Sequence, residues 1–282
     1  MTFPLPHPPR QGSSLTGRRR RVLRAAITAS IAAGTLLSGC TAGGTGSSGD
    51  DTALPKTGVC HRVEKVDAEA VTAPEVSCSS EHDAQTYYAG ALASALAETS
   101  YRSRAAEAAA ATTCGAVFPD HLGTDLSTAM RSLVTWRVFW PSRKAWSDGA
   151  RWFGCDVIGG PRAPLSQDLA ALPEDTEGLL ADDRARERWL ACVDGPSVSE
   201  GSKVPCTRAH DWRAVTTIKL GEPTADYLGD TEVVARTEDF CASSVKAWLG
   251  YPDDFEFGYT WFGKGAWEGG NRRSVCWAKT NR

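Results

Sequence analysis

Two stretches of the chain alternate bulky apolar residues with other residues, as a half-buried β-strand does. Bulky side chains occupy every second position from Val134 to Trp140 and again from Phe255 to Trp261. Successive side chains on a strand point to opposite faces of the sheet, so each stretch is predicted to bury one face.

A helical pattern precedes each of these predicted strands. Residues 100–118 are rich in alanine, and from Thr231 the apolar residues recur with helical spacing. Asp230 is a suitable N-cap for the second helix, and Gly250 is a suitable residue just beyond its end.

Pro119 falls inside the first helical pattern. Proline removes one helix hydrogen bond and disfavours helical backbone in the residue before it. We therefore expect the first helix to end near Phe118, about one turn earlier than the second.

The cysteines repeat in the same order as these elements. The motif Cys78-x3-His82-Asp83 recurs as Cys206-x3-His210-Asp211, and such self-similarity indicates a tandem repeat. The two sets are Cys60, Cys78, Cys114 and Cys155, then Cys192, Cys206, Cys241 and Cys276.

We predict an α+β fold of two tandem small domains, each with an antiparallel sheet, one packed helix and two disulfides. Residues 57–158 form copy one and residues 185–282 form copy two. Residues 159–184 contain three prolines and punctuating acids, which predicts a linker, with a short helix at Leu169 to Ala171.

The N-terminus has the pattern of an export signal. Arginines precede a short apolar run over residues 25–37, which ends in the lipobox-like sequence Leu37-Ser38-Gly39-Cys40. We expect residues 1–39 to be a lipoprotein signal peptide and Cys40 to carry the lipid (palmitate-type acyl chains). An ordinary signal peptide is the alternative, and the arginine pairs also allow a twin-arginine route. Residues 40–56, rich in Gly, Ser and Thr, are predicted to be a flexible tether.

Loss of residues 1–39 removes six arginines and no acid, so the formal charge moves from -3 to about -9. An acidic chain is not expected to bind nucleic acid. We expect a membrane contact only through the N-terminal lipid, on the extracytoplasmic face, with envelope or division proteins as partners. Arginine outnumbers lysine and alanine is abundant, which is typical of an actinobacterial genome.

Eight cysteines remain after Cys40, an even number that predicts disulfides in an exported chain. Zinc is the alternative, because Cys-x3-His occurs in each copy, but closely spaced cysteine pairs are absent. Four cysteines per copy allow three pairings, and the sequence does not choose among them. We favour the first with the second and the third with the fourth. We expect no metal and no cofactor.

His82, Asp83, His210 and Asp211 are the most prominent polar candidates for a binding site. Adjacent strand residues point to opposite faces, so neither pair forms a His–Asp dyad. The structural interpretation is that each histidine begins a strand and bonds the turn that follows the preceding cysteine. The functional alternative is a ligand contact, or a pH-sensitive one. No catalytic constellation is visible, so we do not expect an enzyme.

Four tryptophans recur in both copies and are expected in the cores: Trp140, Trp146, Trp261 and Trp267. Trp152, Trp212 and Trp277 are not matched between the copies, which makes them candidates for a copy-specific binding surface. Arg151 and Trp152, beside a glycine-containing loop, form the first such patch.

The cysteine frame, the His-Asp pairs and the Trp-x-x-Gly-x-Arg motif ahead of the last cysteine resemble the septum formation domain of actinobacterial envelope proteins. The resemblance covers about 58–158 and 188–280. It implies cell-envelope or cell-division biology. The lipobox-like sequence, the tether, the repeat and the missing catalytic constellation lead us to predict a lipid-anchored extracytoplasmic binding or scaffold protein of the cell envelope, linked to septum formation or cell division. The alternative is an envelope enzyme that acts on wall or lipid through His82 or His210.

Overall fold

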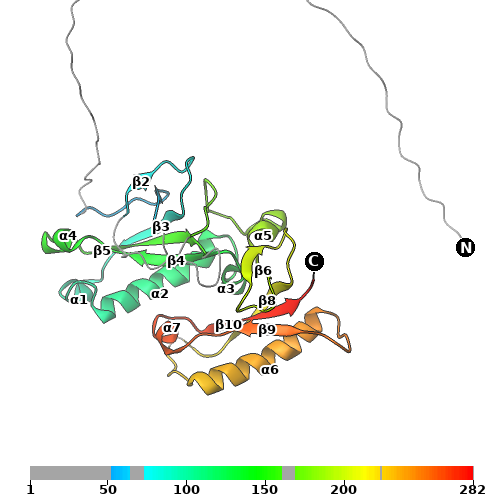
Figure 1. Cartoon of the computed structure of the whole chain (residues 1–282). Coiled ribbons are helices and arrows are strands. Elements are labelled where there is room, and N and C mark those ends of the chain that lie inside the picture. The colour runs from blue at the N-terminus through cyan, green and yellow to red at the C-terminus, as the bar shows by residue number, and fades with distance from the viewer. Residues whose placement is uncertain (1–51, 64–72, 161–168, 223, 282) are drawn as a thin grey trace, which may run out of the picture. The chain divides into compact units, whose positions relative to one another are not determined.

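The computed structural model describes residues 52–63, 73–160, 169–222 and 224–281 (Figure 1). The predicted signal peptide and Cys40 lie outside the described residues. None of the described helices is both long and apolar enough to cross a membrane.

Copy one contains a five-stranded antiparallel sheet with the order β2-β1-β3-β5-β4. Three long strands, β3, β5 and β4, carry most of the pairing, and β1 and β2 extend the sheet on the side of β3. The strands are β1 Cys60–His61, β2 Glu75–Val76, β3 Ala84–Ala91, β4 Val134–Phe139 and β5 Trp152–Gly159.

Copy two repeats this sheet strand for strand, with the order β7-β6-β8-β10-β9. The strands are β6 Ala191–Asp194, β7 Ser202–Pro205, β8 Trp212–Lys219, β9 Phe257–Thr260 and β10 Arg273–Lys279. Even the β-bulge recurs, at Tyr87 in β3 and at Val215 in β8. The predicted α+β fold is therefore confirmed.

One long helix packs on each sheet: α2 (Arg104–His121) in copy one and α6 (Asp230–Trp248) in copy two (Figure 1). Each turns a row of residues four apart toward its sheet, with a cysteine in the row. The rows are Ala106, Ala110, Cys114 and Phe118, then Val233, Thr237, Cys241 and Val245. The N-cap of α6 is Gly229, one residue before the predicted Asp230.

Short helices that the sequence patterns did not predict complete the fold. Helices α4 and α7 stand at equivalent places, just ahead of the last strand of each copy. The short helices are α1 Ser94–Ala97, α3 Leu126–Met130, α4 Arg143–Ser147, α5 Asp183–Trp189 and α7 Lys264–Glu268.

The favoured cysteine pairing is confirmed in both copies. One bridge per copy joins the first strand to the end of the second, and the other joins the long helix to the last strand. The bridges are Cys60–Cys78, Cys114–Cys155, Cys192–Cys206 and Cys241–Cys276.

The expectation that the first helix ends near Phe118 is wrong. Helix α2 continues through Pro119 to His121, the equivalent of Trp248 at the end of α6. Proline removes only its own N–H from the helix, while Leu122 still donates to Phe118. Phe118 and Leu122 are both buried, so their packing offsets the lost hydrogen bond.

The segment predicted as a linker packs against copy one. Its residues 169–181, here called the covering segment, place Leu172, Leu179 and Leu180 in the same core cluster as residues of α2 and β3. No helix forms at Leu169 to Ala171. The N–H of Leu172 instead donates to the carbonyl of His82, 2.9 Å away, which fixes the segment to the start of β3.

Removing disulfides in copy two should destabilise it according to the length of loop that each bridge closes. Cys241–Cys276 spans 35 residues and Cys192–Cys206 spans 14. The chain-entropy model gives a loss about 0.8 kcal/mol larger for the longer loop. Denaturant unfolding of the two double Cys→Ala variants would measure this, and a larger loss from the shorter loop would contradict it.

Candidate functional site

The histidine of each repeated His-Asp pair bonds the turn behind it. The Nδ1 of His82 donates to the carbonyl of Ser80 at 2.8 Å, and the Nδ1 of His210 donates to that of Arg208 at 2.7 Å. Both rings are buried, and their Nε2 atoms have no hydrogen-bond partner within the described part of the chain. The predicted bond from each histidine to its turn is therefore present, whereas the strands begin two residues later, at Ala84 and Trp212.

The aspartate of each pair fixes the end of the first strand in its own copy. Asp83 accepts from the N–H of Val63 at 2.6 Å, and Asp211 accepts from the N–H of Gly195 at 2.8 Å. Val63 and Gly195 each stand three positions after the first cysteine of their copy. The same backbone tie is therefore made twice.

Arg151 is also matched in the second copy, where Arg272 makes equivalent contacts. The Arg151 guanidinium lies 4.2 Å from the Trp146 ring centre and donates to the carbonyls of Trp146 and Ala97. The Arg272 guanidinium lies 4.0 Å from the Trp267 ring centre and donates to the Trp267 carbonyl. Arg151 and His82 bond to different segments, so the structure does not assemble them into one site.

The surface patch predicted at Trp152 is wrong, because Trp152 is only 3% exposed. It packs with Phe139, and Trp212 and Trp277 are buried in copy two. Trp261 was predicted to lie in the core of copy two, and this prediction is also wrong, because its side chain is 45% exposed. The neighbouring Phe262 takes the inward position and stacks on Trp267 with ring centres 5.9 Å apart.

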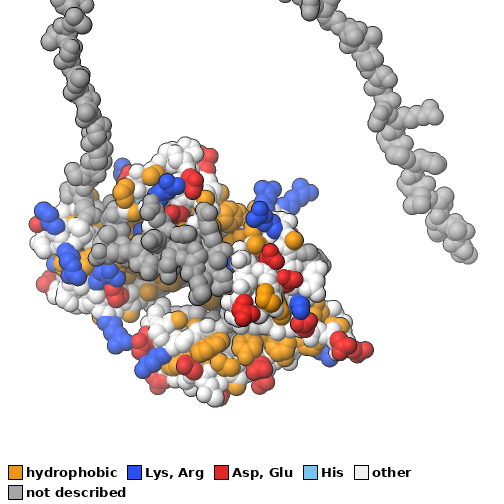
Figure 2. Space-filling model, viewed as in Figure 1, with side chains coloured by type: hydrophobic (Ala, Val, Ile, Leu, Met, Phe, Trp, Pro, Cys, Tyr) orange, Lys and Arg blue, Asp and Glu red, His pale blue; other side chains and the backbone are white. Residues whose placement is uncertain are grey.

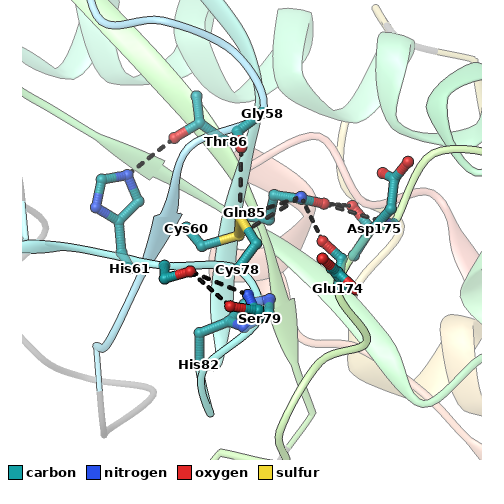
Figure 3. Close-up of a disulfide and its surroundings, with 12 residues drawn as sticks. Gly58, Cys60, His61, Cys78, Ser79, His82, Gln85, Thr86, Glu174 and Asp175 are labelled. Carbon is teal, nitrogen blue, oxygen red and sulfur yellow. Dashed lines mark hydrogen bonds between the residues drawn. A yellow bond between two sulfur atoms is a disulfide. The ribbon is translucent and has the colours of Figure 1, made fainter. Parts of the chain in front are cut away.

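Copy one contains a buried polar network that the sequence patterns did not indicate. Asp156 on β5 accepts from the Thr86 hydroxyl at 2.8 Å and from Arg137 Nε at 3.1 Å. The Nε2 of His61 lies 3.1 Å from the Thr86 oxygen, a contact drawn in Figure 3. The Asp156 side chain is 1% exposed and that of Arg137 is 10% exposed, so the ion pair is shielded from water.

His61 joins this network to the backbone ahead of β2. Its Nδ1 lies 3.0 Å from the carbonyl of Ala73, which can only accept. The Thr86 hydroxyl lies between Nε2 of His61 and the Asp156 carboxyl group. Arg137 is the ion-pair partner of that carboxyl group.

Burial raises the pKa of Asp156 above the ordinary carboxyl range, and the charges of Arg137 and His61 act in the opposite direction. Protonation of Asp156 would therefore leave the charge of Arg137 without its buried counter-ion.

Copy two has no equivalent of this network. At the positions of His61, Thr86 and Asp156 it carries Val193, Ala214 and Trp277, which pack together as an apolar cluster. One signal was present in the sequence: His61 and Asp156 each follow a cysteine directly, where copy two has Val193 and Trp277.

Next to the network, Gln85 on β3 joins the sheet to the covering segment. Its Oε1 accepts from the N–H and the hydroxyl of Thr176 at 2.8 and 2.5 Å, and its Nε2 donates to the Glu174 carbonyl at 3.3 Å. Figure 3 shows the Gln85 amide between the Cys60–Cys78 bridge and the covering segment. The 3.5 Å approach of Cys78 to the Gly58 carbonyl is a packing contact, since a disulfide sulfur carries no proton.

A cleft of about 280 Å³ opens beside Gln85. Asp175, Glu177 and His121 line it, and the two carboxylates favour a small cationic ligand over an anionic one. Burial lowers the pKa of His121, and the charges of Glu177 and Asp175 act in the opposite direction. No group of three or more His, Cys, Asp or Glu side chains suited to a metal occurs among the residues that the structure describes.

These features define a disulfide-stapled α+β repeat protein whose matched polar residues bond their own backbone. A family model described as septum formation matches residues 57–276, without a break between the copies. The chain belongs to this family, which links it to septum formation and to an envelope or division-related location. The search of curated proteins found no match, and the search of solved structures found none either.

We expect His82→Ala to lower the free energy of unfolding by about 0.5–1.5 kcal/mol, because the hydrogen bond from the buried His82 ring to the exposed Ser80 turn is lost. His82→Asn should lose less, since its amide can donate near the position of Nδ1. The same pair of variants at His210 is the matched control in copy two. Full stability of His82→Ala in denaturant unfolding would contradict the structural role.

Arg137→Met should cost about 3–5 kcal/mol at neutral pH, because it leaves a buried carboxylate without its main partner. The variant raises the pKa of Asp156 further. At a pH between the ordinary carboxyl pKa and the raised pKa of Asp156, this side chain is protonated in the folded state and ionised in the unfolded chain. The free energy of unfolding therefore falls as pH rises through this range. The loss should therefore shrink as pH is lowered.

The double variant Arg137→Met, Asp156→Leu is the control, because it replaces the charged pair with apolar groups as in copy two. It should recover most of the stability, with no added pH dependence. Denaturant unfolding at several pH values measures both variants. An equal loss for Arg137→Met at every pH would contradict the role of Asp156.

Proposed function

We propose that the protein is a lipid-anchored binding or scaffold protein of the bacterial cell envelope, acting on the extracytoplasmic face in septum formation. Membership of the septum formation family supports the biological setting. The cysteines support the proposed export and lipid anchor.

The observation that carries the proposal is the use of the cysteines. All eight cysteines after Cys40 are paired, two bridges in each copy. Such bridges persist outside the reducing cytosol, which supports an exported protein. Cys40 is the one cysteine left over, and it stands where the lipobox-like sequence places a lipid.

Binding is favoured over catalysis by the contacts of the candidate residues. A general base must reach its substrate, whereas His82 and His210 are buried and use Nδ1 to bond their own turns. Asp83, Asp211 and Arg151 likewise bond backbone groups of their own copy. These contacts support a rigid scaffold that presents surfaces to other proteins.

The anchor and tether set where such a scaffold can act. A lipidated Cys40 followed by a polar segment up to residue 56 would let two folded copies stand off the membrane. The formal charge of about -9 without residues 1–39 disfavours nucleic acid and anionic lipid as partners. Envelope or division proteins are therefore the proposed partners.

Cys40→Ser should abolish incorporation of a clickable palmitate analogue and move the protein from the membrane to the soluble fraction. The four disulfides do not involve Cys40, so the eight remaining cysteines of both proteins should resist maleimide before reduction. Equal labelling of the wild type and the variant would refute the anchor. If maleimide reacts with these eight cysteines in the native wild type before reduction, the proposal that the protein resides in an oxidising compartment is refuted.

A further inference from the structure

The long helix ends differently in the two copies. In copy one the covering segment lies over the end of α2: the N–H of Gly178 donates to the carbonyl of His121 at 2.8 Å, and that of Leu180 to Leu122 at 2.9 Å. A Cβ added to Gly123 would meet the Cβ of Ala181 at 2.8 Å, so the segment fits tightly there.

In copy two the equivalent place is open. A Cβ added to Gly250, the counterpart of Gly123, would meet no atom within 4 Å. No backbone N–H of the described residues donates to the carbonyls of Trp248 and Leu249, the counterparts of His121 and Leu122. Two acceptors that are bonded in copy one are therefore available in copy two.

Exposed aromatic side chains occur on the second half of α6 and just beyond its end. Phe240, Trp248 and Tyr251 are 37%, 46% and 71% exposed, and together with Gly250 they form what we call the open helix end. Trp248 is the last residue of α6, and Phe240 lies about two turns earlier on the same helix. Figure 2 shows apolar side chains gathered along α6.

Copy one has no aromatic residue of this kind. At the positions of Phe240, Trp248 and Tyr251 it carries Thr113, His121 and Thr124. The aromatic residues are thus absent where the chain supplies its own cover and present where the surface is open.

Tyr251 also holds an unfavourable backbone conformation. Its φ is +64°, in the left-handed region that a bulky residue rarely adopts, and its N–H donates to the Lys246 carbonyl. A strained backbone at a residue whose large ring is exposed to solvent indicates a functional surface.

Two acids, Asp253 and Asp254, outnumber Lys246, the basic residue in the last turn of α6, so the formal charge at the open helix end is negative. Asp253 and Asp254 follow Tyr251, are exposed, and replace the Leu126 and Ser127 of copy one. Neither takes part in an ion pair within the described ranges. The carboxyl end of a helix adds its own partial negative charge, so the surface is complementary to a basic partner.

We propose that the open helix end binds an extended segment of another envelope protein that contains leucines and carries lysine or arginine. The segment would lie as the covering segment lies on copy one. Its backbone would donate to the carbonyls of Trp248 and Leu249, its leucines would pack on the aromatic rings, and its cations would face Asp253 and Asp254.

This inference rests on the proposed scaffold function and names the chemistry of its partner. The probe is a peptide of residues 169–181 in which Glu174, Asp175 and Glu177 are replaced by lysine. The unaltered peptide is its matched acidic control. Both are titrated by fluorescence anisotropy into the full oxidised chain, in which the tethered covering segment already occupies copy one.

The lysine peptide should bind, and Trp248→His should weaken it about tenfold, the usual effect of removing a central aromatic anchor. Tyr251→Thr, a second surface variant, should also weaken binding. Ser243→Ala, an exposed position on the outer face of α6, should leave it unchanged. The acidic peptide should bind more weakly, and added salt should reduce the difference.

Lysine-peptide affinity that is unchanged in both Trp248→His and Tyr251→Thr would overturn the proposal. Self-association that depends on Trp248 in sedimentation would also overturn it, because a second copy of the chain would then be the occupant. Binding to phosphatidylglycerol vesicles that depends on Trp248 would overturn it as well. Cys40→Ser should leave peptide binding intact. A failed anchor and a failed binding surface are therefore distinguishable.

Discussion

The fold depends on the covalent bond between the long helix and the last strand of each copy. Cys114–Cys155 and Cys241–Cys276 hold helix and strand with Cα atoms 5.6 and 5.1 Å apart. The buried row ahead of the cysteine holds Ala106 and Ala110 in α2 and the larger Val233 and Thr237 in α6, so the bridge fits both kinds of packing. A bridge of this kind supplies stability that a core of about 100 residues obtains only with difficulty.

Around this frame the two copies share their backbone ties and differ in their interiors. The His-Asp pairs and the arginine–tryptophan contacts recur because each satisfies a backbone group that the fold creates twice. The sheet interiors diverge, with Asp156 and Arg137 in copy one and Trp277 and Gly258 at the same places in copy two. The two halves therefore have the same frame, whereas the interior and the surface differ between them.

Patterns that the fold repeats could be predicted from sequence, whereas packing between distant segments could not. The cysteine spacing indicated the repeat, and the pairing that we favoured is the one that the structure shows, although spacing alone left three pairings open. The burial of Trp152 and the exposure of Trp261 depend on which neighbours reach each ring, and periodicity does not record that. The Asp156 network and the covering segment join residues far apart in sequence, so no local pattern contained them.

The order of the disulfides bears on how the chain is made. Every bridge joins two cysteines that are consecutive in the folded part, 18, 41, 14 and 35 residues apart. A chain that leaves a membrane channel N-terminus first presents its cysteines in the same order. An oxidase that pairs each thiol with the next to emerge would therefore make every native bond at the first attempt. Slow disulfide exchange, which limits many secreted proteins, is then not required for maturation.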